Sequence, residues 1–109
     1  MPHSRPLPIE LSPEAQLDFI EILQFTEERF GFEQRDIYAD WIDAALQRLA
    51  QNPALGKETH RSGYYRYHIA AVGKPGRHYL YYRVFSNALQ IARIMHDRMD
   101  YLRHPPFNE

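Results

Sequence analysis

The chain has 109 residues, of which 44% are apolar and 14% aromatic, and its formal net charge is -1 at pH 7. This length predicts one domain over residues 1–109 with a small core, and we expect flexible ends at 1–8 and 103–109. The absence of cysteine excludes a disulfide framework and a thiolate metal site. No apolar run is long enough to span a bilayer and no secretory signal is recognisable, so a cytoplasmic protein without membrane association is expected.

Charge is divided unequally along the chain. Residues 10–51 contain ten Asp or Glu against three Arg, whereas residues 57–104 contain nine Lys or Arg against three Asp or Glu. An acidic half therefore precedes a basic half. Either the two halves neutralise each other within the fold, or the basic half attracts an acidic partner.

The N-terminal part predicts a short strand and then a helix. Prolines before residues 9–11 lack backbone donors, so this segment is expected as an edge strand. Ser12 followed by Pro13 is typical of a helix start, since the hydroxyl accepts a backbone N–H and proline is tolerated in the first turn. Apolar residues at helical spacing follow and end before Gly31, which is expected to adopt positive φ: Ala15, Phe19, Ile22, Leu23, Thr26 and Phe30.

A second helical stripe continues to about Ala50, where Asn52 and Pro53 stop it. Its members are Tyr38, Trp41, Ile42, Ala45 and Leu49. Two helices with a short connection predict an antiparallel helical hairpin. The aromatic residues Phe19, Phe30 and Trp41 are interpreted as core residues, because helical spacing is what packing against a sheet requires.

Three runs rich in β-branched and aromatic residues follow, at 63–72, 78–85 and 88–96. They are separated by turn residues, first the run Gly-Lys-Pro-Gly at 73–76 and then Ser86 with Asn87. This pattern predicts an antiparallel meander. The expected fold is therefore α+β, with an N-terminal helical hairpin packed on a small, mainly antiparallel sheet.

Alternation along the first two strands predicts two different faces. The apolar face holds Tyr65, Tyr67, Ile69, Ala71, Leu80, Tyr82 and Val84. The opposite face is aromatic and basic and holds Tyr64, Arg66, His68, Tyr79, Tyr81, Arg83 and Phe85. We expect the first face to pack on the helices and the second to be a docking surface. In the last strand the pattern does not decide which face Arg93 occupies.

The order and spacing of these residues resemble a known family. The pieces are Ala15, Asp18, Phe19, Ile22, Phe30 and Gly31; Leu49, Asn52, Pro53 and Gly56; Tyr65, Arg66, Tyr82, Arg83 and Val84; and Ile91, Arg93, Ile94, His96, Arg98 and Asp100. Over about residues 11–102 the chain resembles the RelE/ParE superfamily of toxin–antitoxin toxins, and the ParE branch in particular. The resemblance implies a small toxin that a cognate, ParD-like antitoxin holds inactive.

ParE-like members of this superfamily act on DNA gyrase, whereas RelE-like members cut messenger RNA on the ribosome, and a shared fold does not decide between them. As a hypothesis, the end of the last strand contacts gyrase through Arg93, His96, Arg98 and Asp100. The structural alternative is that Arg98 with Asp100, or Arg93 with a nearby carboxylate, forms an ion pair that pins the strand end.

For the antitoxin we expect a segment that folds as it docks, as an amphipathic helix in a groove, an added strand, or both. The predicted groove walls are the first helix and the outer sheet face. The predicted anchors are Tyr64, Arg66, Tyr81 and Arg83.

An mRNA endonuclease is the enzyme alternative, with Arg66, Arg83, Arg93, His96 and Tyr101 as its candidate groups. The isoelectric point near 6.6 and the presence of lysine only at positions 57 and 74 disfavour it. An inactive interaction module is a third alternative. No cofactor, metal site or sequence-specific nucleic-acid binding is expected, because the six histidines show no ligand spacing and no phosphate loop is present.

Overall fold

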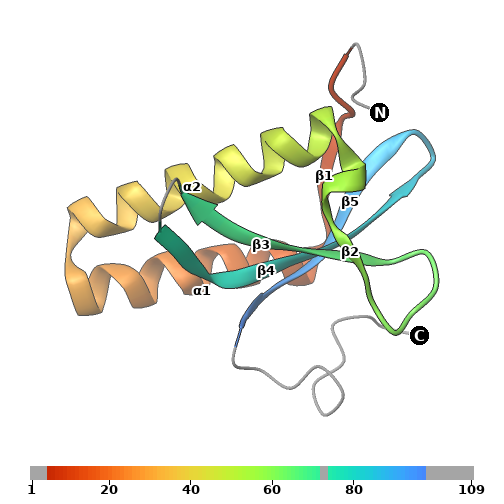
Figure 1. The fold of residues 1–109 in the computed structure, drawn as a ribbon. Helices are drawn as coiled ribbons and strands as arrows, with labels where there is room; N and C mark the ends of the chain where they lie inside the picture. The colour runs from red at the N-terminus through yellow and green to blue at the C-terminus, as the bar shows by residue number, and fades with distance from the viewer. Residues whose placement is uncertain (1–4, 72–73, 98–109) are drawn as a thin grey trace.

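Two helices cover one face of a five-stranded sheet in the computed structural model, which describes residues 5–71 and 74–97 (Figure 1). The elements are β1 (Ile9–Leu11), α1 (Pro13–Phe30), α2 (Phe32–Gln51), a 3-10 turn (Pro53–Leu55), β2 (Lys57–Glu58), β3 (Tyr65–Ala71), β4 (Lys74–Phe85) and β5 (Ala88–His96). The strand order is β1-β5-β4-β3-β2, with β1 parallel to β5 and the other neighbours antiparallel. The predicted α+β fold and the edge strand at residues 9–11 are confirmed.

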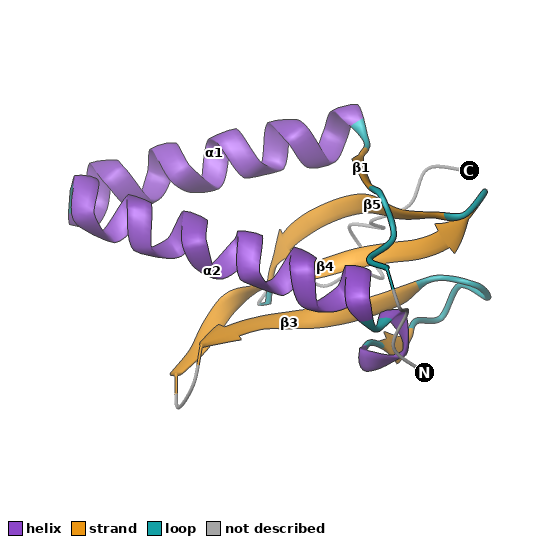
Figure 2. Ribbon diagram, turned by 90° about the horizontal axis from the view of Figure 1, so that it is seen from above, coloured by secondary structure: helices purple, strands orange, loops and turns teal. Residues whose placement is uncertain are grey.

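The helical hairpin begins and turns where the sequence predicts. The Ala15 N–H donates to Ser12 Oγ at 2.9 Å, and Pro13 occupies the first helical turn. Gly31 alone separates the two helices and has a φ of 91°, which favours glycine. Figure 2 shows the helices side by side over the sheet, with their connection projecting beyond the strands. Neither helix is long and apolar enough to cross a membrane.

The core lies between the hairpin and the inner face of the sheet. Its buried members include Ala15, Ile22, Ile42, Ala45, Leu46, Leu49 and Ala50 from the helices and Ile69, Leu80, Tyr82, Leu89, Ile91 and Ile94 from the strands. Tyr65 and Tyr67 pack against them, so the predicted inner face is confirmed for β3 and β4. Val84 departs from it at 46% exposure, since it lies beside the Ser86–Asn87 turn at the sheet end.

One aromatic residue of the predicted core is not in it. Phe30 is 67% exposed, because it is the last residue of α1, where the hairpin extends past the strands. Phe19 and Trp41 are half-buried against the core, as predicted. The prediction for Phe30 was therefore wrong, and its ring remains available at the surface.

The predicted turn at 73–76 also needs correction, because β4 already begins at Lys74 and Pro75 pairs with Ala70. Proline is tolerated there because the register shifts between His68 and Ala70, and such irregularities relax the ladder. A Cβ on Gly76 would lie 2.4 Å from the Ile69 carbonyl oxygen. This glycine therefore permits close approach of two strands and does not form the turn.

A β-bulge explains why alternation could not place Arg93. Tyr81 pairs with Arg93 but Tyr82 pairs with Ile91, so Ala92 is an extra residue on β5. Because of this insertion, Ile91 and Ile94 both reach the core although they are three positions apart.

Candidate functional site

The side chains of Ser12 and Asp18 form hydrogen bonds with backbone groups at the edge of β5, beyond the point where β1 ends. Ser12 Oγ donates to the Ala92 carbonyl at 2.7 Å, and the Ile94 N–H donates to Asp18 Oδ2 at 2.9 Å. Arg93 donates from Nε to Asp18 Oδ2 at 2.8 Å and from Nη2 to Oδ1 at 2.9 Å. The bond to this carboxylate is the main cause that raises the pKa of Arg93. The ion pair expected as the structural alternative for Arg93 is therefore present.

A groove of about 700 Å³ lies between the helical hairpin and the ends of β4 and β5. Its helical wall carries the apolar side chains Ile22, Phe25, Phe30, Ile37 and Trp41, with polar residues such as Glu21 and Gln34 among them. Exposures of 56% for Phe25, 67% for Phe30 and 43% for Ile37 are high for such large apolar side chains. The strand side carries the polar residues Arg77, His78, Arg93 and His96 together with the apolar residues Ile94 and Met95. Exposed apolar side chains rimmed by polar residues are typical of a protein-docking groove.

A tyrosine–histidine contact joins the two sides of this groove. Tyr38 Oη of α2 accepts the Arg77 N–H at 3.0 Å and lies 2.7 Å from Nδ1 of His78 on β4. Burial, and next the neighbouring His96, lower the pKa of His78 to about 4. The imidazole is therefore neutral at pH 7, and Nδ1 can accept a hydrogen bond from the Tyr38 hydroxyl.

The lowered pKa of His78 predicts acid-sensitive folding. The unfolded chain, with a histidine pKa near 6.5, binds more protons than the folded chain between about pH 6.5 and 4, so stability falls as the pH falls through this window. At pH 4.5 we expect His78 to have lowered the free energy of unfolding by on the order of 2 kcal/mol, a figure that allows for its partial exposure. Urea unfolding of the wild type and of His78→Gln between pH 7.5 and 4.5 measures this contribution as the difference between their stability profiles. If the two profiles were parallel over this range, the prediction would be contradicted.

The outer face of the sheet is aromatic and basic, as predicted. The Arg83 guanidinium carbon lies 5.5 Å from the ring centre of Tyr64 and 4.3 Å from that of Phe85. Arg66 lies 4.7 Å from the ring centre of Tyr79. A second apolar cluster lies on this face, with Tyr81 and Met95 buried among Tyr64, Tyr79 and Ala92. The two guanidinium groups thus lie over aromatic rings.

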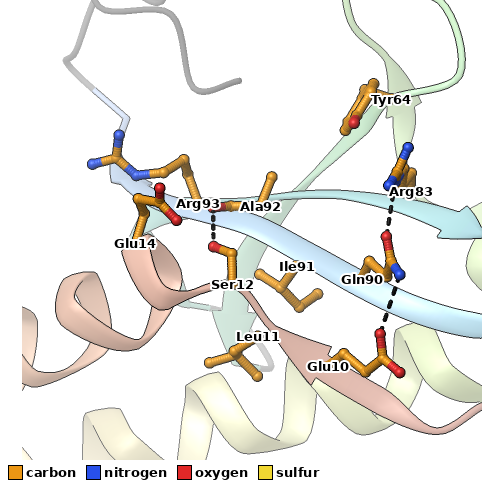
Figure 3. Close-up of a pocket in the computed structure, with 10 residues that line it drawn as sticks. All are labelled: Glu10, Leu11, Ser12, Glu14, Tyr64, Arg83, Gln90, Ile91, Ala92 and Arg93. Atoms are coloured by element: carbon orange, nitrogen blue, oxygen red, sulfur yellow. Dashed lines mark hydrogen bonds between the residues drawn. The ribbon is translucent and has the colours of Figure 1, made fainter. Parts of the chain in front are cut away.

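A smaller pocket of about 260 Å³ lies where this outer face meets β1 and the start of α1 (Figure 3). A hydrogen-bonded row crosses three strands at its edge. Arg83 Nε donates to Gln90 Oε1 at 2.8 Å, and Gln90 Nε2 donates to Glu10 Oε1 at 3.1 Å. Arg93 lines both this pocket and the groove, so the two hollows adjoin at this residue of β5.

Comparison with known proteins identifies the relatives of this chain. Residues 9–101 match the model of the family described as "ParE toxin of type II toxin-antitoxin system, parDE". The chain belongs to the ParE toxin family. It is 32% identical over 99 residues to Toxin ParE1 of Caulobacter vibrioides, a match that covers 89% of this chain and 96% of that protein. It is 36% identical over 93 residues to Toxin ParE1 of Mycobacterium tuberculosis (strain CDC 1551 / Oshkosh), covering 83% and 89% respectively.

Solved structures show the same fold. A chain of the chromosomal ParDE system from P. aeruginosa aligns with a TM-score of 0.72 at 17% identity, covering 83% of this chain and 95% of that one. A chain of the toxin–antitoxin complex RelBE2 from Mycobacterium tuberculosis aligns with a TM-score of 0.58 at 20% identity, covering 84% and 99%. The predicted ParE-like membership of the RelE/ParE superfamily is confirmed.

The structure distributes the predicted site residues of this ParE-family chain over both hollows. Arg93 and His96, proposed for gyrase, line the groove, whereas Arg98 and Asp100 lie outside the described residues. Of the residues proposed for the antitoxin, Tyr64 and Arg83 line the smaller pocket, and Arg66 is stacked on Tyr79. Tyr81 is only 2% exposed, so its ring supports its neighbours and presents little surface to a partner. These contact roles remain predictions.

Sequence reasoning missed most of the groove wall and the two residues that join Arg83 in the polar row. Phe25 and Ile37 lie off the predicted core stripes, and this off-stripe apolar character was the available signal. Glu10 gave no signal, because its contact with Gln90 joins residues 80 positions apart. Gln90 lies opposite Arg83 in the β4–β5 hairpin, and that cross-strand pairing was the available signal. Among the described residues, acidic and histidine side chains form no cluster able to hold a metal ion.

Proposed function

We propose that this ParE-family toxin inhibits DNA gyrase by binding it, breaks no bond itself, and is neutralised by its cognate antitoxin. The observation that supports binding over catalysis is that the candidate catalytic residues do not all line one hollow. Among the described candidates, His96 lines only the groove and Arg83 only the smaller pocket, while Arg66 lines neither. Arg93 lines both hollows, but its guanidinium is paired with Asp18. Acid–base catalysis requires groups that converge on one substrate atom, and these residues do not converge.

The groove suits a different task, which is to hold a segment of another protein. Its apolar helical wall is long enough for several anchors, with Phe25 and Phe30 from α1 and Ile37 and Trp41 from α2. Arg77 on the strand side complements an acidic residue on such a segment. Covering these exposed rings would remove apolar surface from water. We therefore assign the groove to an amphipathic helix of the antitoxin, which extends the expected first-helix wall to both helices.

Purified toxin tests the choice between gyrase and messenger RNA. Added to gyrase with relaxed plasmid, the toxin is expected to abolish supercoiling or to trap cleaved DNA, and prior mixing with the antitoxin should restore activity. The matched control is translating ribosomes carrying a labelled message, which should remain intact. Degraded message with unchanged supercoiling would reverse the assignment in favour of the endonuclease. An effect on neither would favour an inactive interaction module.

A further inference from the structure

The Arg83 side chain is oriented by its surroundings but lacks an acidic partner. Its Nε is held by Gln90, and its guanidinium lies between the rings of Tyr64 and Phe85. Among the described residues no carboxylate lies within ion-pair distance of it, whereas Arg93, the other arginine of the pocket, is neutralised by Asp18. Figure 3 shows Arg83 at the pocket edge, between Tyr64 and Gln90. Its charge is thus uncompensated and fixed in place.

Gln90 has a specific part in this arrangement. It faces Glu10 on one neighbouring strand and Arg83 on the other, since the register pairs Glu10 with Gln90 and Gln90 with Arg83. Its amide donates to Glu10, which turns the amide oxygen toward Arg83. A carboxylate at position 90 would form an ion pair with Arg83 and quench its charge. The neutral amide orients the guanidinium and leaves the charge unquenched.

We propose that Glu10 and Gln90 are positioning residues that present the terminal nitrogens of Arg83 to a carboxylate of the antitoxin, bound at the 260 Å³ pocket. A guanidinium fork held in one orientation binds a carboxylate through two parallel hydrogen bonds. The stacked arrangement reduces the conformational freedom that binding would otherwise remove. The proposal rests on the proposed neutralisation by an antitoxin and names one contact within it.

The sign of the Glu10 effect separates this mechanism from simple charge attraction. By Coulomb's law alone, removing a negative charge near a site for an anion should tighten binding. If Glu10 acts by orienting Gln90, removing it should weaken binding, and a glutamine in its place should restore binding because its oxygen still accepts from Gln90. The two explanations therefore predict opposite results for the same substitution.

The test measures affinity of the full-length toxin variants for the antitoxin encoded beside it, by calorimetry at two salt concentrations. We expect Arg83→Met to weaken binding about 30-fold with a smaller salt dependence, and Gln90→Glu about 10-fold. Glu10→Ala should weaken it about 3-fold, while Glu10→Gln stays near wild type. Thermal unfolding checks that each variant is folded. If Arg83→Met is unstable, Gln90→Glu provides the test instead, because its side chain still accepts a hydrogen bond from Arg83.

Gyrase inhibition by the same variants identifies the source of the carboxylate and should be unchanged. Loss of gyrase inhibition with unaltered antitoxin affinity would assign the carboxylate to gyrase and overturn the proposal. Tighter or unchanged antitoxin binding by Glu10→Ala and Gln90→Glu would overturn it as well, while leaving neutralisation by the antitoxin intact. A wild-type chain that does not bind the antitoxin at all would overturn the proposed neutralisation together with this contact.

Discussion

Replacing Asp18 with alanine is expected to lower the free energy of unfolding by about 3 kcal/mol. Asp18 is 9% exposed, and its two oxygens accept from Arg93 Nε, Arg93 Nη2 and the Ile94 N–H. Alanine would leave a partly buried guanidinium without its counter-charge and a β5 edge donor without an acceptor. Both losses arise at the point where β1 no longer covers the edge of β5.

Urea unfolding of Asp18→Ala measures this loss, with Glu28→Ala as the matched control. Glu28 is an exposed acidic residue of the same helix, so its replacement should change stability by less than about 0.5 kcal/mol. Equal effects of the two substitutions would show that Asp18 contributes only general helix charge. Asp18→Asn should be intermediate, because an amide oxygen can still accept one of the three hydrogen bonds.

The Asp18 measurement also bears on the predicted gyrase contact. Arg93 uses two donors for Asp18, and 30% of its side chain remains exposed. Arg93→Ala will therefore lower stability whatever its partner role, and a loss of toxicity alone cannot assign the contact. His96, which also lines the groove, is the better single test of that region, because its side chain is 38% exposed and the carboxylate at 3.4 Å from its Nδ1 belongs to its chain neighbour Asp97.

Local chemistry made most of the fold predictable from sequence. The helix start at Ser12 and Pro13, the break at Gly31 and the inner faces of β3 and β4 depend on neighbouring residues or on simple periodicity. The failures depend on distant contacts. The sequence predicts a turn at Gly76, because it does not show how closely the Ile69 carbonyl approaches this glycine. The bulge at Ala92 interrupts the two-residue period on which alternation depends.

The candidate site was predictable in composition but not in arrangement. Alternation placed Tyr64, Arg66 and Arg83 on one aromatic and basic face, which the structure confirms. It could not show that Arg93 reaches Asp18, because that pair joins residues 75 positions apart. Nor could helical spacing reveal that the hairpin projects past the sheet and leaves Phe30 uncovered. Phe30 is one of the exposed apolar side chains that line the groove.

Replacing Phe30 with glutamate is expected to weaken antitoxin binding about 100-fold while leaving the toxin folded. The ring lines the groove yet is 67% exposed in the free chain, so its loss costs the fold little. In the complex, however, an amphipathic helix would bury this position, and an unpaired carboxylate there would be desolvated without compensation. Ile37→Glu on the facing helix should act in the same direction, because Ile37 lines the same groove.

Phe32→Glu is the matched control for this prediction. Phe32 is 63% exposed and lies across Gly31 from Phe30, but it does not line the groove. Both substitutions remove one exposed ring and add one negative charge at the hairpin end, so net charge and solubility change equally. Calorimetry with the antitoxin should therefore show a large loss for Phe30→Glu and little for Phe32→Glu. Equal losses of affinity for the two variants would mean that antitoxin binding depends on the charge at the hairpin end, and that the antitoxin does not bind in the groove.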